Sequence, residues 1–309
     1  MRTFAKVKED KLLFYDIETA PLVRELEIDT PLYDSWEYKA NKTGEKTSEE
    51  VISSYSVESG LYPEFAKVVT IVVGKIVKGK IVLITFDDAE EVDILNKFNS
   101  LLDRNGDNTL VGFVNKSFDT PFTAKRMILN GIQPNDKLDS SGLKPWELEE
   151  IDLAETWKMT SFNRASLINI ATAFGLPSPK DDISGADVGR VYWSEGLAGL
   201  KRIAKYCRQD VIATINIFRK MNLKDTLPVD PNFIDVEPTE EPLLEKLING
   251  SRYGKAEKDM LIKELTGMTP DERSKAFDIL DSVTSKAKGK VTKMTKTHVT
   301  ALKKMFKDE

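Results

Sequence analysis

The sequence contains a single cysteine, Cys207, and a single histidine, His298, among its 309 residues. One cysteine excludes an internal disulfide and any zinc site built from several cysteines. One histidine excludes a metal centre built mainly from imidazole groups. Any metal that the protein binds is therefore expected to be a hard cation held by carboxylate oxygens.

Long hydrophobic runs are also missing. No apolar run approaches the roughly 20 residues that a membrane span requires. The first ten residues, MRTFAKVKED, lack the apolar core of a signal peptide. We therefore expect a cytoplasmic protein with no membrane contact. The length allows one large domain with an appendage.

Proline and acidic residues gather in residues 226–242, which contain four prolines and five acids. This composition is typical of a linker. It predicts a domain over residues 1–225 and a helical, lysine-rich region over residues 243–309. Within that region, residues 269–272 read as a capping box, and residues 284–307 contain eight lysines and no acid. Such a run is either a solvated helix face or a surface that binds the phosphates of a nucleic acid. The candidate phosphate contacts are Lys286, Lys288, Lys290, Lys293 and Lys296.

Strand and helix patterns alternate along residues 1–225. Apolar and β-branched residues predict strands, and residues separated by three or four positions predict helices. Together these elements predict an α/β domain with a mixed sheet. The predicted strands are 12–17, a hairpin over 67–86, and 109–115, and the predicted helices are 89–105, 120–131 and 200–218.

Two acids, Asp16 and Glu18, interrupt the apolar stretch LLFYDIETA. Residues two apart on a strand share one face, so the two carboxylates would lie side by side. Like charges at this distance are unfavourable unless a cation lies between them. The alternative is a pair of acids on an exposed sheet edge.

Two further sites carry acids in notable positions. Asp119, in NKSFDTPF, lies where the predicted strand 109–115 meets the next helix, and it could simply cap that helix. Asp210, in YCRQD, lies four residues after Tyr206 on the long helix, so both would share one side of it. Asp210 could equally be a solvated helix acid.

In this order, DIET, N-x-x-F-D-x-P-F and Y-x-x-x-D resemble the three motifs of the DEDD exonuclease superfamily over about residues 8–222. The resemblance is closest to the proofreading exonuclease domain of family-B DNA polymerases and to standalone exonucleases of bacteria and phages. It implies an RNase H-like (DnaQ-like) exonuclease fold with a mixed central sheet, followed here by a small C-terminal helical appendage. The third motif carries Tyr206 and has Lys205 where the other class has histidine, so the sequence resembles the tyrosine (DEDDy) class.

The resemblance also implies a metal centre with two divalent cations, Mg²⁺ or Mn²⁺. Asp16 would bridge both cations, while Glu18 and Asp210 would hold the one that activates a water molecule. Asp119 would hold the other cation. Tyr206, whose ordinary pKa of about 10 makes it a poor base at neutral pH, would orient the attacking water.

The activity implied is 3′→5′ hydrolysis of single-stranded DNA to 5′-mononucleotides. The expected partners are the 3′ ends of single-stranded DNA, with a separate DNA polymerase or replication protein as a further candidate. Asn115 is expected to contact the frayed strand, whereas Phe118 is either a strand contact or part of the core, the latter being favoured. Two alternatives stay open: an RNase D-like exoribonuclease, and a catalytically silent RNase H-like module that binds nucleic acid or tethers partners.

Overall fold

The structure is a computed structural model that describes residues 8–88, 90–144, 146–179 and 182–230. The chain divides into two units, residues 1–237 and residues 238–309. The predicted helical region 243–309, including its capping box and its five candidate lysines, lies outside the described residues.

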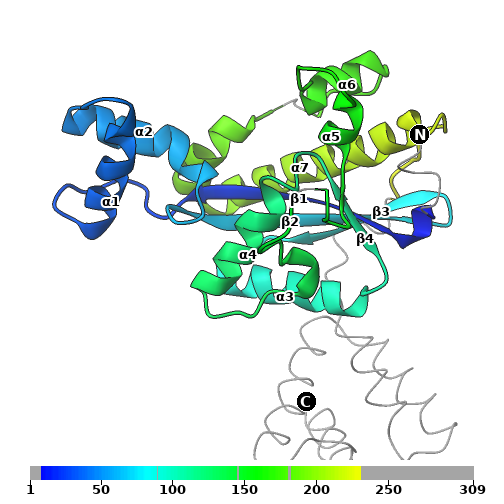
Figure 1. Cartoon of the computed structure of the whole chain (residues 1–309), viewed down its shortest axis with the longest axis horizontal. Helices are drawn as coiled ribbons and strands as arrows, with labels where there is room; N and C mark the ends of the chain where they lie inside the picture. Colours follow the sequence, from blue (N-terminus) through cyan, green and yellow to red (C-terminus); the bar gives the residue numbers. More distant parts are fainter. Residues whose placement is uncertain (1–7, 89, 145, 180–181, 231–309) are drawn as a thin grey trace, which may run out of the picture. The chain divides into compact units, whose positions relative to one another are not determined.

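A five-stranded sheet forms the centre of the described part of the chain, in the order β3-β2-β1-β4-β5 (Figure 1). Strands β1, β2 and β3 pair in antiparallel fashion, whereas β4 runs parallel to both β1 and β5. The mixed sheet predicted from the sequence is therefore confirmed. The strands are β1 (Leu12–Pro21), β2 (Ala66–Val77), β3 (Lys80–Phe86), β4 (Thr109–Gly112) and β5 (Ile151–Asp152).

Helices cover both faces of this sheet (Figure 1). Helix α7 (Val188–Met221) packs on one face, and α3 (Glu91–Arg104) with α4 (Asp119–Leu129) packs on the other. Alternate side chains of β1 pack on opposite faces of the sheet. The ring centroid of Phe14 lies 5.4 Å from that of Phe218 on α7, and the ring centroid of Tyr15 lies 5.7 Å from that of Phe98 on α3. Since side chains alternate along a strand, Asp16 follows Phe14 onto the face that α7 covers.

The remaining helices lie around this core. Residues 24–62, between β1 and β2, include two helices that pack around the fully buried Trp36. Two further helices follow β5, where the Trp157 and Phe174 rings lie 5.4 Å apart. The α-helices of these two groups are α1 (Pro31–Ala40), α2 (Ser48–Glu58), α5 (Leu153–Lys158) and α6 (Leu167–Ala173). The short 3₁₀ turns are η2 (Glu9–Lys11), η3 (Asn41–Thr43), η4 (Ser59–Leu61), η5 (Asp136–Leu138) and η6 (Gly185–Asp187).

Two predicted elements differ in length from the observed ones. The strand predicted over residues 109–115 ends at Gly112, because Val114 has a positive φ of 69° and turns the chain toward α4. The helix predicted over residues 200–218 belongs to the longer α7, which is interrupted at Gly196 with φ of 56°. Glycine tolerates this conformation, whereas for a β-branched valine it is a marked outlier.

The first residues of the predicted linker lie against edge strand β3. The main-chain N–H of Ile81 donates to the carbonyl of Pro228, and that of Asp230 donates to the carbonyl of Ile81, both at 2.9 Å. Residues 226–230 thus extend the ordered pairing of the sheet, while residues 231–242 lie outside the described residues.

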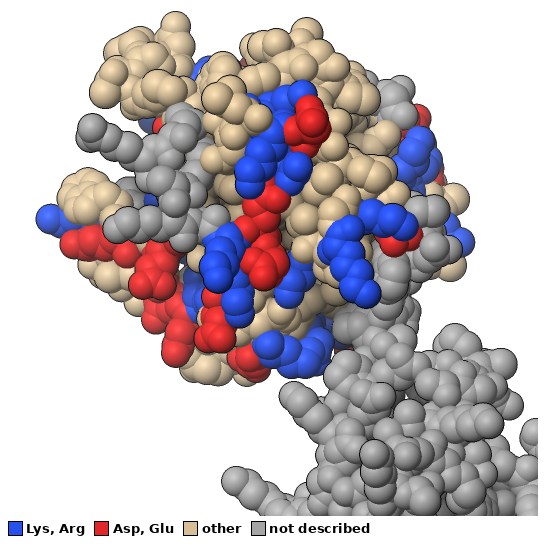
Figure 2. All heavy atoms as spheres, turned by 90° about the vertical axis from the view of Figure 1, so that its right-hand side faces the viewer, with Lys and Arg blue, Asp and Glu red and all other residues tan. Residues whose placement is uncertain are grey.

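Charges of both signs alternate at the end of the molecule formed by β3 and the carboxyl end of α7 (Figure 2). At this end Glu9 pairs with Arg219 at 2.5 Å and with Lys224 at 3.0 Å. Glu9 thus neutralises two of the basic side chains at this end of the described residues. Within the described residues, no helix is long and apolar enough to span a membrane.

Gly74 on β2 allows α7 to lie close to the sheet. A methyl group at this position would lie 2.7 Å from Val211 and 2.8 Å from Ile215, so α7 would have to move. We expect Gly74→Ala to lower the free energy of unfolding by about 1–3 kcal/mol, the usual effect of overpacking. The matched change Gly106→Ala meets no atom closer than 3.9 Å and should not lower it. Urea denaturation measures both variants, and equal stability would contradict this packing.

Candidate active site

Asp16 and Glu18 lie on β1 and project from the face of the sheet that α7 covers. Glu18 is buried and Asp16 is half-buried. The pairing of β1 with β2 shifts register between Glu18 and Thr19, and such bulges often occur beside functional sites, where they redirect a side chain. The two acids do not lie on an exposed sheet edge, because β2 pairs with this part of β1 on one side and Asp119 of α4 covers Ile17 on the other.

Asp119 reaches this site from the opposite edge of β1. It is the first residue of α4, is buried, and accepts a hydrogen bond from the main-chain N–H of Ile17 at 3.1 Å. Strand β4 pairs only with residues 12–14 of β1, so the carboxylate of Asp119 takes the place that a longer β4 would have filled. The N-cap of α4 is Phe118, and the carboxylate of Asp119 accepts hydrogen bonds both from its own main-chain N–H and from Ile17 on β1, so capping is not its only contact.

Tyr206 and Asp210 come from α7, one helical turn apart. Asp210 is buried, with 8% of its surface exposed, and its carboxylate accepts a hydrogen bond from the Tyr206 hydroxyl. Asp210 is therefore not a solvated helix acid. The Tyr206 ring is also buried, in a cluster with Ala20 and Ile203, so its hydroxyl is held in one place.

The four acids act on one another electrostatically. Burial raises the pKa of Asp16 well above its ordinary value, and the charges of Asp119, Glu18 and Asp210 raise it further. Burial raises the pKa of Asp119 to about 7, even though the N–H of Ile17 opposes the rise. Both shifts mean that the ionised forms are unfavourable in this cluster without a compensating positive charge.

A divalent cation fits this arrangement. The site supplies carboxylate oxygens, which are the ligands that Mg²⁺ and Mn²⁺ prefer. Donor atoms of Asp16, Glu18 and Cys207 lie within 4.8 Å of one another. A bound cation would offset the mutual repulsion that raises the pKa of Asp16. The structure thus brings together all five residues for which a catalytic role was predicted, although their roles stay predictions.

Asn115 does not lie on the surface where a strand was expected to bind. Its side chain is fully buried, and its Nδ2 donates to the Glu150 carboxylate at 2.7 Å. The hydroxyl of Thr120, in the first turn of α4, donates to the same oxygen at 2.6 Å and also bonds to the Tyr15 hydroxyl. A direct contact between Asn115 and nucleic acid would require this network to break. Asn115 instead helps to fix the turn that carries Asp119.

Phe118 packs beside α4. Its ring lies 5.4 Å from that of Phe122, and the side chain is half-buried against the core on the α3–α4 face. This position fits the core role that the sequence favoured for it.

Two residues of the site were not predicted from the sequence. Glu150 is buried next to Asp119 and raises its pKa. Nothing in the acid-rich run ELEEID distinguishes it from its neighbours. Cys207 lies against Asp16, with its Sγ 3.4 Å from Asp16 Oδ2. The sequence placed it only within the predicted helix 200–218, and its position next to Tyr206 in the third motif was the available signal.

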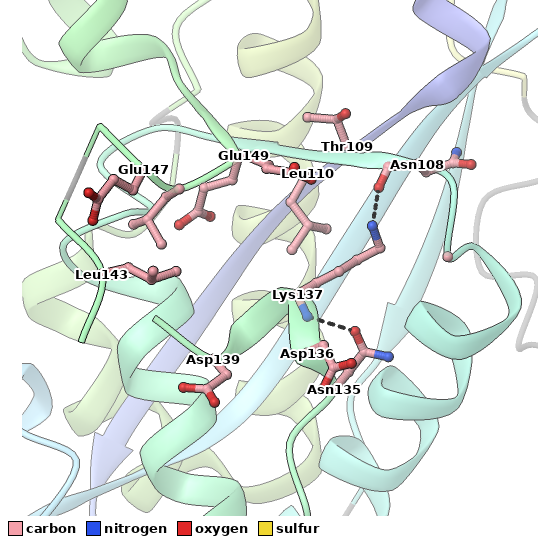
Figure 3. Close-up of a pocket in the computed structure, with 13 residues that line it drawn as sticks. Asn108, Thr109, Leu110, Asn135, Asp136, Lys137, Asp139, Leu143, Glu147 and Glu149 are labelled. Carbon is pink, nitrogen blue, oxygen red and sulfur yellow. Dashed lines mark hydrogen bonds between the residues drawn. The ribbon is translucent and has the colours of Figure 1, made fainter. Parts of the chain in front are cut away.

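A pocket of about 520 Å³ lies between the start of β4 and residues 135–150, and Glu150 is among the residues that line it. Figure 3 shows Asp139, Glu147 and Glu149 around it, while Lys137 extends to the main-chain oxygen of Asn108, to which it donates at 2.7 Å. This acidic lining would repel a phosphate backbone. The pocket is therefore not a candidate for binding the substrate of the acid cluster.

This mixed five-stranded sheet, with helices on both faces and four acids gathered beside the middle of its central strand, is consistent with an RNase H-like exonuclease fold. The chain belongs to the family described as predicted 3′-5′ exonucleases related to the exonuclease domain of PolB, whose model matches residues 61–241. The match includes Asp119, Tyr206 and Asp210 but begins after Asp16 and Glu18.

Comparison with other proteins gives weaker likenesses. No curated protein sequence matches the chain. Among solved structures, the family B DNA polymerase from the hyperthermophilic archaeon Pyrobaculum calidifontis is similar, with 15% sequence identity and a TM-score of 0.43. The likeness covers 69% of this chain but only 24% of the polymerase chain.

Proposed function

We propose that the protein is a metal-dependent exonuclease that removes 5′-mononucleotides from the 3′ end of single-stranded DNA. The observation that carries this proposal is the meeting of Asp16, Glu18, Asp119 and Asp210 beside the hydroxyl of Tyr206. A silent binding module would have no use for four mutually repelling acids, because their burial destabilises the fold. Membership of an exonuclease family supports the same reaction class.

In this proposal the acids hold two divalent cations. Glu18 and Asp210 would bind one, Asp119 the other, and Asp16 would bridge the two. When bound, such cations lower the pKa of a water molecule and neutralise charge on the phosphate and on the leaving 3′-oxygen. The protein contributes the fixed positions of these carboxylates, which come from β1, α4 and α7.

Tyr206 positions the attacking water in this proposal. Burial raises the pKa of Tyr206 far above its ordinary value, and the charges of Asp210 and Glu18 raise it further, so the phenol stays protonated. Because its proton is donated to Asp210, the oxygen is free to accept a hydrogen bond from water. The residue therefore orients water and does not act as the base.

A gel assay tests the function directly. The full chain is incubated with 5′-labelled single strands of DNA and RNA of the same sequence, in Mg²⁺, Mn²⁺ or EDTA. We expect a ladder of DNA shortened from the 3′ end with either metal and none in EDTA. Degradation in EDTA, or from the 5′ end, would contradict the mechanism, and preferential cleavage of RNA would favour the exoribonuclease. A polymerase or replication partner stays a prediction.

The variant Tyr206→Phe tests the positioning role. We expect kcat to fall roughly 10- to 1000-fold, about tenfold less than the roughly 100- to 10,000-fold that a general acid or base contributes, because Tyr206 only orients the water. The stabilisation by added Mn²⁺ should persist, because no carboxylate is lost. Tyr33→Phe is the matched control, since Tyr33 is equally buried but bonds to Glu37 within α1. An unchanged kcat in Tyr206→Phe would show that this tyrosine has no role in the reaction.

A further inference from the structure

Cys207 is placed as a potential metal ligand. It is fully buried on α7, and its Sγ lies 3.4 Å from both the Oδ2 and the main-chain oxygen of Asp16. The donor atoms of Cys207, Asp16 and Glu18 all lie within 4.8 Å of one another. One half-buried carboxylate, one buried carboxylate and one buried thiol, contributed by β1 and α7, thus lie around one small volume.

The spacing matches that of a tetrahedral site with mixed sulfur and oxygen ligands. Zinc binds thiolate sulfur at about 2.3 Å and carboxylate oxygen at about 2.1 Å, which places the two ligands about 3.6 Å apart at the tetrahedral angle. The observed distance between the sulfur of Cys207 and Oδ2 of Asp16 is 3.4 Å. Mg²⁺ gains nothing from a sulfur ligand, whereas a soft thiolate favours Zn²⁺ and related cations.

We propose that Cys207, Asp16 and Glu18 form a site for a thiophilic divalent cation of the Zn²⁺ type. The thiol proton is released to solvent when the sulfur binds the cation. Because Asp16 and Glu18 are shared, this cation excludes the hard cations that the proposed nuclease activity requires. That consequence rests on the proposed function, but the binding itself does not.

The competing explanation is that Cys207 only donates a hydrogen bond to Asp16. Cys207→Ser separates the two explanations, because a hydroxyl keeps a donor of similar size but removes the soft ligand. A purely hydrogen-bonding cysteine therefore predicts similar binding of soft cations in wild type and variant. If Cys207 is instead a metal ligand, Cys207→Ser should selectively lose affinity for soft cations.

Cadmium is a suitable probe because the cadmium–thiolate bond absorbs in the ultraviolet. The chain has one cysteine, so any such band in the full-length protein must come from Cys207. Titration of the metal-free protein with Cd²⁺ should produce a band that saturates at one equivalent per chain. In Cys207→Ser the band should vanish and the affinity for Cd²⁺ by calorimetry should fall at least about tenfold, with a smaller change for Mg²⁺.

Two further variants locate the site. Asp16→Asn should weaken Cd²⁺ binding, since it removes a charged ligand, whereas Tyr206→Phe should retain the band. Absence of the band in wild type, or equal Cd²⁺ affinity in wild type and Cys207→Ser, would overturn the proposal. The absorption is read without nucleic acid, so its absence beside Mg²⁺-dependent exonuclease activity would reject the cysteine site alone. A band without any nuclease activity would instead leave the cysteine site standing and reject the proposed function.

Discussion

Replacing Asp16 with asparagine should lower the single-turnover rate of 3′-end hydrolysis at least about 1000-fold, equivalent to about 4 kcal/mol of transition-state stabilisation. Asparagine keeps the shape of aspartate but not its charge. Asp16 is the acid that experiences the charges of all three others and is the proposed bridge between both cations. Its loss should therefore remove both cations from their positions.

The measurement is a quenched single-turnover assay with excess enzyme and a 5′-labelled strand, so that substrate binding does not limit the rate. Asp107→Asn, an exposed loop position, is the matched control and should retain the wild-type rate. Circular dichroism should show an unchanged fold in both variants. A rate for Asp16→Asn within tenfold of wild type would falsify the proposed role of this residue.

Asp119→Asn should stabilise the metal-free protein while removing much of its stabilisation by metal. The pKa of Asp119 is about 7 in the folded protein, against an ordinary value of 3.8. The folded state therefore binds the proton more tightly than the unfolded chain does. This difference favours folding fully below about pH 4 and is lost as the pH rises to about 7.

At pH 8 the ionised Asp119 thus destabilises the folded protein, and replacing it with asparagine removes this destabilisation. At 1.36 kcal/mol per pKa unit, the relief is roughly 2–4 kcal/mol, which raises the melting temperature in EDTA by roughly 5 °C or more. The acceptor for the N–H of Ile17 is kept, because asparagine also carries a side-chain oxygen. Between pH 5 and pH 8 the variant should also lose less stability than wild type.

Added Mn²⁺ should reverse the order of stability of wild type and Asp119→Asn. A ligand at 100 times its Kd stabilises a protein by about 2.7 kcal/mol, and wild type should gain this while Asp119→Asn gains less. Thermal melts in EDTA and in saturating Mn²⁺, at pH 5 and pH 8, measure both effects, with Asp107→Asn as the control expected to follow wild type. A lower melting temperature for Asp119→Asn in EDTA at pH 8 would contradict the burial argument.

Local patterns in the sequence were enough to predict the parts of the site that lie on regular elements. The alternation along β1 predicted that Asp16 and Glu18 share a face, and the helical period predicted that Tyr206 and Asp210 are neighbours. Both relations depend only on the geometry of one element. The same patterns predicted strands β1 to β4, helices α3 and α4, the second half of α7 and the mixed sheet, but not β5 or the helices α1, α2, α5 and α6.

Contacts between distant elements were not predictable in this way. Asn115 was expected at the surface, but its partner Glu150 lies 35 residues later, and no periodicity relates the two. The end of β4 was placed too late because valine favours extended structure, whereas Val114 adopts a positive φ that the surrounding turn imposes. Cys207 lies within the predicted helix 200–218, but a helical pattern does not reveal which atom a buried sulfur contacts.

The dependence of the site on α7 also governs when the proposed activity can begin. A ribosome completes Asp16, Glu18 and Asp119 well before it reaches Tyr206 and Asp210, since the chain is made in sequence order. Only when α7 has emerged and packed on β1 do all the acids share one site. On the proposed function, a nascent chain therefore lacks nuclease activity until α7 has packed on β1.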